Sequence, residues 1–278
     1  MHDTEVNLCL VGCGKMGIAM LSGWRKLSAL KAEIVIIDPA FDVSQALSST
    51  KTVSLRYVKD SSELPESYYA DIVILAVKPQ TMDKVLPQVA SLGNSQTGWL
   101  SIAAGISTAG LASHISSSAR LMRAMPNTPA AIGAGITVLY CNDAVTARQK
   151  EIAETLLQAC GDVVHIEDEL MMNAVTAVSG SGPAYVFLLA EVMANAGRKL
   201  GLPSDVAQKL ARQTVSGSGA LLAAETLPAS TLRENVTSEG GTTFAALSVL
   251  MAKDGMADLF TRALEAVAMR AKELDNSR

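Results

Sequence analysis

Three glycines near the start of the chain have a spacing that suits phosphate binding. Gly12, Gly14 and Gly17 form a G-x-G-x-x-G pattern in the segment VGCGKMGIAM, directly after the apolar run at 6–11. The first glycine of such a pattern allows a tight turn, the second lets the backbone approach a pyrophosphate, and the third lets the following helix pack closely. Because a helix N-terminus attracts anions, the segment predicts a dinucleotide-binding turn.

Asp38 stands where a carboxylate would bind the adenosine ribose. It ends the second apolar run (33–38), about 20 residues after the last glycine of the pattern. A carboxylate there binds the ribose hydroxyls of NAD and repels the 2′-phosphate of NADP. The residues that follow, PAFDVSQ, contain no arginine or lysine to bind that phosphate. NADH is therefore predicted to be used at least comparably to NADPH; the alternative is that Asp38 is only a helix cap or a charged loop residue.

Small and polar residues end three further predicted strands, which run over 71–77, 99–104 and 119–125. Ligands of open α/β sheets bind at the carboxyl ends of the strands, so these residues are expected to line one crevice. With the glycine-rich turn, the predicted cofactor-binding residues are Gly12, Gly14, Lys15, Met16, Gly17, Asp38, Ala76, Val77, Lys78, Pro79, Ala103, Ala104, Gly105 and Asn127.

The segment SEGGTT (238–243) is a second candidate for anion binding. Its paired glycines are unfavourable inside a helix, where glycine costs about 1 kcal/mol relative to alanine. The segment opens the helical run TTFAALSVL. Bare N–H groups at a helix start bind carboxylates, so it predicts a site for an anionic substrate group, with a simple helix cap as the alternative.

The chain offers few residues for acid–base or metal chemistry. His114 and His165 are the only internal histidines, and both are expected to be ordinary core or surface residues. The cysteines form no C-x-x-C pair, so free thiols are expected and no metal site is predicted. These cysteines are Cys9, Cys13, Cys141 and Cys160.

These candidate residues need an α/β framework to position them. Short β-branched runs alternate with helical patterns up to about residue 166, and the early runs are apolar almost throughout, as in strands covered on both faces. The pattern predicts a Rossmann-like, doubly wound sheet in which the last strands join antiparallel. The predicted strands are 6–11, 33–38, 52–58, 71–77, 99–104, 119–125, 135–141 and 161–166.

The second half of the chain reads as helix. This predicts a dinucleotide-binding domain (1–166) followed by an all-α domain (167–278). The run at 184–196 is apolar nearly all round and must be buried on most sides, which predicts that this domain packs against a second copy in an obligate homodimer. Expected helices are 182–201, 204–226, 242–255 and 256–276, with N-caps at Ser204 and Thr242 and C-terminal stops at Gly201 and Gly255.

The amino-acid composition argues against nucleic acid and membrane as binding partners. The 278 residues are mildly acidic (23 Lys+Arg against 27 Asp+Glu) and contain no basic cluster, which argues against nucleic-acid binding. The N-terminal segment lacks the basic residues of a signal peptide, and no run is expected to supply the roughly 20 apolar residues that span a bilayer. A cytoplasmic protein without a membrane partner is predicted.

Six motifs in order give the chain a family resemblance: GCGKMG, AVKPQ, SIAAGI, RAMPNTPA, VSGSGPAYVF and VTSEGGTT. Together they resemble the pyrroline-5-carboxylate reductase family over nearly the whole chain. The resemblance implies a dinucleotide-binding domain and a helical domain interlocked in a dimer, in some members assembled into a decamer of five dimers. It also implies hydride transfer from NADPH or NADH to the C=N carbon of pyrroline-5-carboxylate, giving L-proline in the last step of proline biosynthesis.

The resemblance also implies roles for individual residues. Thr243 is expected to hydrogen-bond the ring nitrogen as the catalytic residue, and the SEGGTT loop to bind the substrate carboxylate. Glu225 matches a family carboxylate near the site, and AVSGSGPAYVF (177–187) is placed near the nicotinamide, or is only a helix start. The implied substrate-binding residues are Glu225, Ser238, Gly240, Gly241, Thr242 and Thr243.

Two residues depart from the family pattern. The family generally prefers NADPH, which Asp38 puts in doubt here, and it usually has proline at the position of Glu239.

A β-hydroxyacid dehydrogenase is the rival enzyme, but the helices expected at 182 and 204 have no lysine near their starts to act as an acid–base residue. A cofactor-binding regulatory protein without turnover is the rival outside enzymes.

Overall fold

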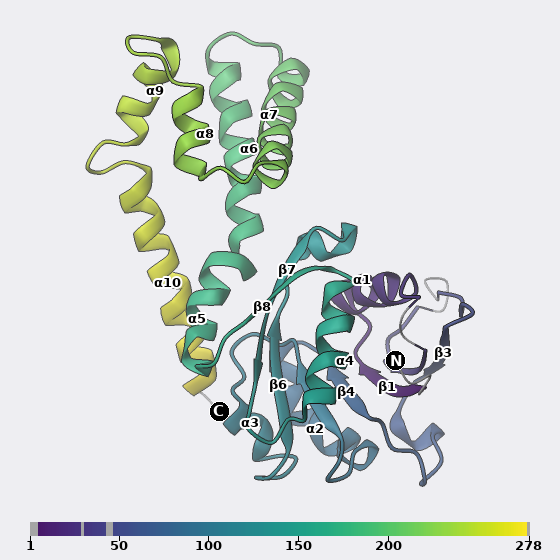
Figure 1. The fold of residues 1–278 in the computed structure, drawn as a ribbon. Coiled ribbons are helices and arrows are strands. Elements are labelled where there is room, and N and C mark those ends of the chain that lie inside the picture. The colour runs from purple at the N-terminus through teal and green to yellow at the C-terminus, as the bar shows by residue number, and fades with distance from the viewer. Residues whose placement is uncertain (1–4, 29–30, 43–46, 277–278) are drawn as a thin grey trace. The chain divides into compact units, whose positions relative to one another are not determined.

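The chain folds into two compact units. The computed structural model describes residues 5–28, 31–42 and 47–276. Unit 1 comprises Met1–Gly180 together with Val267–Arg278, and unit 2 is Ser181–Ala266 (Figure 1). The functional division predicted between residues 166 and 167 differs from this division by packing and stays a prediction.

Unit 1 contains an eight-stranded sheet in the order β3-β2-β1-β4-β5-β6-β7-β8. The first six strands are parallel, β7 runs antiparallel to β6, and β8 follows the direction of β7. This confirms the doubly wound fold and the reversal expected at its last strands. The strands are β1 (Val6–Val11), β2 (Ala32–Ile37), β3 (Val53–Val58), β4 (Ile72–Leu75), β5 (Gly98–Ser101), β6 (Arg120–Met125), β7 (Gly135–Cys141) and β8 (Gly161–His165).

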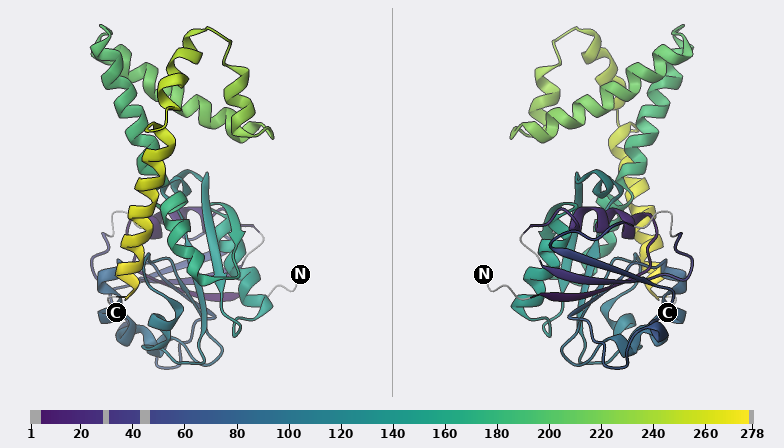
Figure 2. Two further views of the ribbon diagram at one scale, coloured as in Figure 1. Left: turned by 90° about the vertical axis from the view of Figure 1, so that its left-hand side faces the viewer. Right: turned by 90° about the vertical axis from the view of Figure 1, so that its right-hand side faces the viewer.

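Helices cover both faces of this sheet, as the two views of Figure 2 show. Along β1, Leu8 and Leu10 pack with α1 and α4 on one face, whereas Cys9 and Val11 pack with α2 and α3 on the other. All four side chains are almost fully buried, which explains why the strands read as unbroken apolar runs. These helices are α1 (Lys15–Trp24), α2 (Met82–Val89), α3 (Thr108–Ala112) and α4 (Ala147–Gln158).

Helical segments connect unit 1 to unit 2 in both directions along the chain. α5 (Met172–Val175) is followed by a π-helical turn (Thr176–Gly180), and α10 (Met256–Asn276) carries the chain back. The other helices of unit 2 are α6 (Gly182–Lys199), α7 (Ser204–Ala224), α8 (Ala229–Asn235) and α9 (Thr242–Leu250). The sequence patterns missed α8, and α9 ends earlier than expected.

The predicted helix ends are partly wrong. Gly201 has φ +99° just after α6 and ends that helix as expected. Ser204 and Thr242 are not N-caps, because each is the first helical residue and follows a cap, Pro203 or Gly241, that has no side-chain hydrogen bond. Gly255 does not end α9; it precedes α10, where its carbonyl accepts from the backbone N–H of Leu259.

Unit 2 exposes a large apolar surface. On α6, Val186, Phe187 and Leu188 are 47%, 66% and 55% exposed. The stretch Glu169–Lys199, which includes α5, the π-helical turn and α6, is long and apolar enough to cross a membrane on length and composition alone, contrary to the expectation that no run would be. Since such exposed apolar area is costly in water, this surface calls for a partner.

Candidate active site

The predicted site residues divide between the two units. All of the predicted cofactor-binding residues belong to unit 1, and all of the predicted substrate-binding residues belong to unit 2. Within unit 1, the glycine-rich turn follows β1, and the Lys78, Ala103 and Asn127 segments follow β4, β5 and β6. Since β1, β4, β5 and β6 are parallel neighbours, these segments share the carboxyl edge of the sheet.

The glycine-rich turn is shaped by close packing. Gly12 has φ +91°, and a Cβ at this position would lie 2.8 Å from Val77 Cγ1. A Cβ on Gly17 would lie 2.8 Å from the Gly12 carbonyl oxygen, so the helix α1 can approach the turn only because this residue is glycine. Both residues thus have the geometric roles that the motif predicts.

The start of α1 fits a pyrophosphate. Gly14 is the N-cap of α1 and supplies no side chain to its N–H groups, and no atom of the described residues lies within 4 Å of a Cβ built on it. Lys15 is exposed and Met16 is half-buried at the first two helical positions. The N–H groups and the open space beside them suit the phosphates of a dinucleotide.

Asp38 is tied to this turn. Its Oδ2 accepts a hydrogen bond from the Cys13 backbone N–H at 2.7 Å, and its Oδ1 accepts from the Ala40 backbone N–H at 2.9 Å. The carboxylate therefore lies beside the glycine-rich turn that follows β1, and its oxygens have further lone pairs that can accept hydrogen bonds from ligand hydroxyls. Residues 43–45 of the segment examined for a phosphate-binding base lie outside the described residues.

Structural contacts account for several other predicted cofactor residues. Ala76 and Val77 lie so close to Gly12 that a Cβ on Gly12 would overlap them, and Lys78 is exposed. The Asn127 Oδ1 accepts from the Ile136 backbone N–H at 3.0 Å, which fixes the loop after β6. Pro79 starts a 3₁₀ turn after β4, Ala104 is half-buried, and Ala103 and Gly105 are buried. None of these contacts excludes the predicted role, which stays a prediction.

In unit 2, the SEGGTT segment forms a tight turn that opens α9. The Gly241 N–H donates to the Ser238 carbonyl at 3.0 Å, and Gly240 has φ +70°. Gly241 is the N-cap of α9 without a side-chain cap, and Thr242 and Thr243 are the first two helical residues. The helix start is therefore not blocked by a capping side chain, which is the arrangement that carboxylate binding requires.

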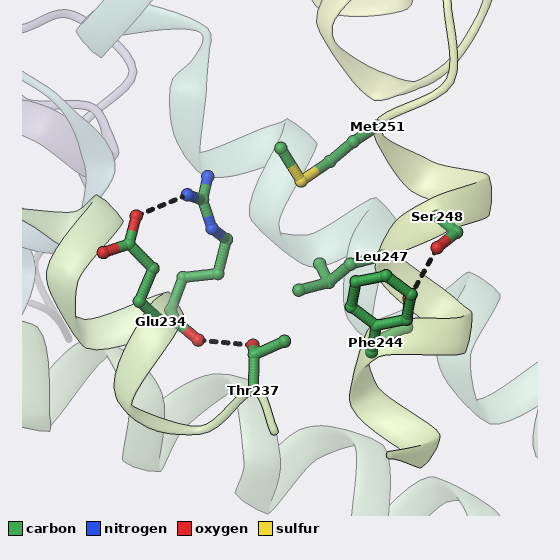
Figure 3. A pocket seen from close by; sticks show the side chains of 7 residues that line it. Glu234, Thr237, Phe244, Leu247, Ser248 and Met251 are labelled. Carbon is green, nitrogen blue, oxygen red and sulfur yellow. Dashed lines mark hydrogen bonds and ion pairs between the residues drawn. The ribbon is translucent and has the colours of Figure 1, made fainter. Parts of the chain in front are cut away.

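A pocket of about 440 Å³ lies next to this turn (Figure 3). Its apolar side comes from α9, and its polar side from the end of α8, where the Arg233 Nη2 lies 3.2 Å from Glu234 Oε1. The pocket does not contain the predicted substrate residues; Glu225 is likewise separate, at the C-cap of α7. Its lining residues are Arg233, Glu234, Thr237, Phe244, Leu247, Ser248 and Met251.

Comparison with known proteins decides the family. The chain is 37% identical to a pyrroline-5-carboxylate reductase of Pseudomonas aeruginosa over 267 residues, which covers 96% of each chain. The chain belongs to the pyrroline-5-carboxylate reductase family. Residues 169–274 match the family model described as pyrroline-5-carboxylate reductase dimerisation, and residues 7–105 match the model described as NADP oxidoreductase, coenzyme F420-dependent.

Solved members of the pyrroline-5-carboxylate reductase family have the same fold. The structure from Coxiella burnetii matches with a TM-score of 0.84 at 31% identity, covering 97% of this chain and 98% of that one. The Plasmodium falciparum structure, solved with NADP bound, matches with a TM-score of 0.81 at 29% identity and the same coverage. The resemblance stated from sequence is thereby confirmed, as is an NAD(P)-dependent oxidoreductase with a C-terminal dimerisation domain.

The histidines and cysteines have no evident place in the reductase site. His165 Nε2 lies 3.3 Å from Glu154 Oε2, and His114 Nε2 lies 4.0 Å from Asp83 Oδ1. In the part of the chain that the structure describes, no group of three or more His, Cys, Asp or Glu could hold a metal ion. The cysteines are free thiols, as expected, and three of them are buried.

Sequence reasoning missed one buried ion pair. Arg123 Nη1 lies 2.6 Å from Glu169 Oε1, and Arg123 is only 6% exposed. The pair joins β6 to the segment before α5, across 46 positions of sequence. The one clue was an arginine inside an otherwise apolar strand, because a buried charge requires a partner.

Proposed function

We propose that the protein reduces 1-pyrroline-5-carboxylate to L-proline in the last step of proline biosynthesis. The observation that carries this proposal is the 37% identity to the Pseudomonas aeruginosa reductase over 96% of both chains. Reduced nicotinamide, when bound, supplies the hydride. The hydride adds to the ring carbon of the C=N bond, and the ring nitrogen, protonated as the iminium, becomes the amine of proline.

The start of α9 supports the choice of substrate. The N–H groups at Thr242 and Thr243 would hold the substrate carboxylate, and the Thr243 hydroxyl would hydrogen-bond the ring nitrogen. An iminium is already electrophilic, so the protein mainly has to position it.

The glycine-rich turn and Asp38 would hold the dinucleotide. Because its carboxylate is fixed beside the turn by the Cys13 N–H, we expect it to bind the ribose hydroxyls of NADH and to disfavour the 2′-phosphate of NADPH. NADH should then be used at least comparably to NADPH. A kcat/KM for NADPH more than about tenfold above that for NADH, a difference of roughly 1.4 kcal/mol, would contradict this.

The exposed apolar surface of α6 supports a homodimer. Val186, Phe187 and Leu188 lie within the segment that matches the dimerisation model, so a second copy is the partner that best accounts for their exposure. A decamer of five such dimers in the cytoplasm is the fuller assembly that we propose. Sedimentation at submicromolar concentration tests it: a stable, active monomer would contradict the dimer, and a dimer alone would contradict the decamer.

The test of the activity is direct. Purified protein with pyrroline-5-carboxylate should oxidise NADH or NADPH, followed by the loss of nicotinamide absorbance, and should form proline. Turnover of a β-hydroxyacid with oxidised cofactor instead would indicate the rival dehydrogenase. Cofactor binding without turnover of either substrate would indicate a regulatory protein.

A further inference from the structure

Two carboxylates from distant segments bind the same short turn in unit 1. Asp275, near the end of α10, accepts from the Ser107 backbone N–H through Oδ1 at 2.8 Å. Glu169 accepts from the Thr108 backbone N–H through Oε1 at 2.7 Å and from the Thr108 hydroxyl through Oε2 at 2.5 Å. We call these contacts the turn clasp. They hold Ser107 and Thr108, two and three residues after Gly105.

The turn clasp includes a buried charge. The Arg123 guanidinium, on β6, lies 2.6 Å from the Glu169 oxygen that also accepts from Thr108. The Arg123 side chain is 7% exposed and the Glu169 side chain 20%. Removing one partner of such a pair leaves an uncompensated charge away from water, so the pair strongly favours one position of Glu169.

α10 packs tightly against the same turn. Gly105 has φ +65°, and a Cβ built on it would lie 2.9 Å from Leu274 Cβ and 3.5 Å from the Ala271 carbonyl oxygen. Ala271 is 5% exposed. The turn is therefore held from two sides, by the carboxylate of Asp275 beside this packing and by Glu169 on the next residue.

The clasped turn begins among predicted cofactor-binding residues. Ala103, Ala104 and Gly105 follow β5 at the carboxyl edge of the sheet, where the ligands of such folds bind. Ser107 and Thr108 follow within three residues. A change in the backbone at the clasped residues would therefore reach the backbone that is predicted to face the dinucleotide.

We propose that Glu169 and Asp275 are positioning residues for the nicotinamide dinucleotide, acting through the turn at 103–108, with Arg123 as the counter-ion of Glu169. The proposal rests on the proposed function only in taking NAD(P)H as the ligand. The two carboxylates do not touch the reacting atoms in it; they fix the shape of a turn that does contact the cofactor.

The test measures cofactor binding without substrate. Glu169→Gln and Asp275→Asn keep side-chain size and remove the charge. We expect the Kd for NADH or NADPH, from nicotinamide fluorescence titration of the full-length protein, to rise about tenfold for Glu169→Gln and about threefold for Asp275→Asn. In turnover, KM for the cofactor should rise in parallel, while KM for pyrroline-5-carboxylate stays within about twofold.

A matched control lies on the same helix. Glu273 forms an exposed pair with Arg270 at 2.7 Å, so Glu273→Gln removes a carboxylate two residues from Asp275 without touching the turn. It should leave the Kd unchanged. If Asp275→Asn and Glu169→Gln lower the melting temperature but bind the cofactor with the Kd of the parent protein, the two carboxylates are structural only and the proposal is overturned.

A milder variant tests the proposal if Glu169→Gln or Asp275→Asn does not fold. Thr108→Val removes one hydrogen bond to Glu169 and leaves the Arg123–Glu169 pair intact. It should raise the Kd about twofold to threefold, with Thr108→Ser restoring the parent value. An unchanged Kd in Thr108→Val would overturn the proposal. Because binding is measured without substrate, the result is independent of whether pyrroline-5-carboxylate is reduced.

Discussion

The two glycine-containing turns of the protein use the same residue for different reasons. In unit 1, a Cβ on Gly12 would overlap the Val77 side chain, so packing within the unit already demands glycine. In unit 2, Gly240 has φ +70° but no described atom within 4 Å of a Cβ, whereas a Cβ on Gly241 would lie 2.5 Å from the Ser238 hydroxyl oxygen. At Gly12 the first turn requires glycine because of packing against the rest of unit 1, whereas at Gly240 the second turn requires it only because of backbone conformation.

Because of this difference, substitutions in the two turns should affect stability and ligand binding to different extents. A residue that is fixed by close packing affects both folding and binding when it is changed. A residue at an exposed helix start affects binding more than stability, because few contacts of the fold depend on it. The comparison therefore predicts which variants lose mainly stability and which lose mainly activity.

Gly12→Ala should give the largest effect. The added Cβ would lie 2.8 Å from Val77 Cγ1 and 2.9 Å from the Ala76 carbonyl group, in a backbone conformation that alanine disfavours. Strain and overlap together should cost about 3–5 kcal/mol of unfolding free energy. Thermal unfolding and cofactor titration should show both a lower melting temperature and loss of binding. A variant of normal stability would show that the turn is not fixed by packing.

Alkaline pH should weaken unit 1 and spare unit 2, since all four cysteines lie in unit 1. Burial raises the pKa of Cys9 from 9.0 to about 12 and that of Cys160 to about 11; burial, followed by the nearby Asp38 carboxylate, raises the pKa of Cys13 to about 11. The unfolded thiols lose protons first, so stability is full below pH 9 and falls as the pH rises toward 11.

The fall should be about 1 kcal/mol per thiol between pH 9 and pH 10. Urea unfolding at pH 8, 9 and 10 measures it, and hydrogen exchange assigns it to a unit. Cys160→Ala should reduce the slope with pH. A slope that stays the same in this variant would show that the thiol does not contribute.

Thr243→Ala should reduce activity with little loss of stability. The hydroxyl is placed at the second residue of α9, and a hydrogen bond to a charged ring nitrogen is worth about 1.5–3 kcal/mol. We expect kcat/KM for pyrroline-5-carboxylate to fall about 10- to 100-fold, while the melting temperature stays the same. Thr243→Ser should recover most of the activity. Unaltered kcat and KM in Thr243→Ala would remove Thr243 from the proposed role.

Gly240→Ala should give the smallest effect. No described atom is within reach of the new Cβ, so only the left-handed backbone conformation is disfavoured, at a cost of about 1–2 kcal/mol. Gly240→Asn, which tolerates this conformation better, should lose less. A loss of stability as large as that of Gly12→Ala would show that both turns are fixed by packing.

Most of the fold could be predicted because its pattern is local. β-branched runs located all eight strands, and the reversal after β6 followed from short connections. The seven-residue α8 was missed because a segment as short and polar as Ala229–Asn235 has little helical periodicity. The π-helical turn before Ser181 was also missed; a Cβ built on its last residue, Gly180, would overlap the side chain of Met125, a residue far away in sequence.

The parts of the candidate site that a sequence motif defines could be predicted. The parts that depend on contacts between distant residues could not. The glycine spacing predicted the roles of Gly12 and Gly17, because the motif describes backbone geometry. The hydrogen bond from Cys13 to Asp38 and the Arg123–Glu169 pair join residues with no fixed spacing, so no pattern indicates them. The helix caps were misplaced by one residue because Pro203 and Gly241 serve without side-chain hydrogen bonds.

The contact between Ser107 and Asp275 has a consequence for the newly made chain. The two residues are 168 positions apart, so at about 5–20 residues per second Asp275 is synthesised roughly 10–30 s after Ser107. During that interval unit 2 is produced while unit 1 lacks the helix that packs on Gly105. The nascent sheet therefore exposes this turn until synthesis reaches α10.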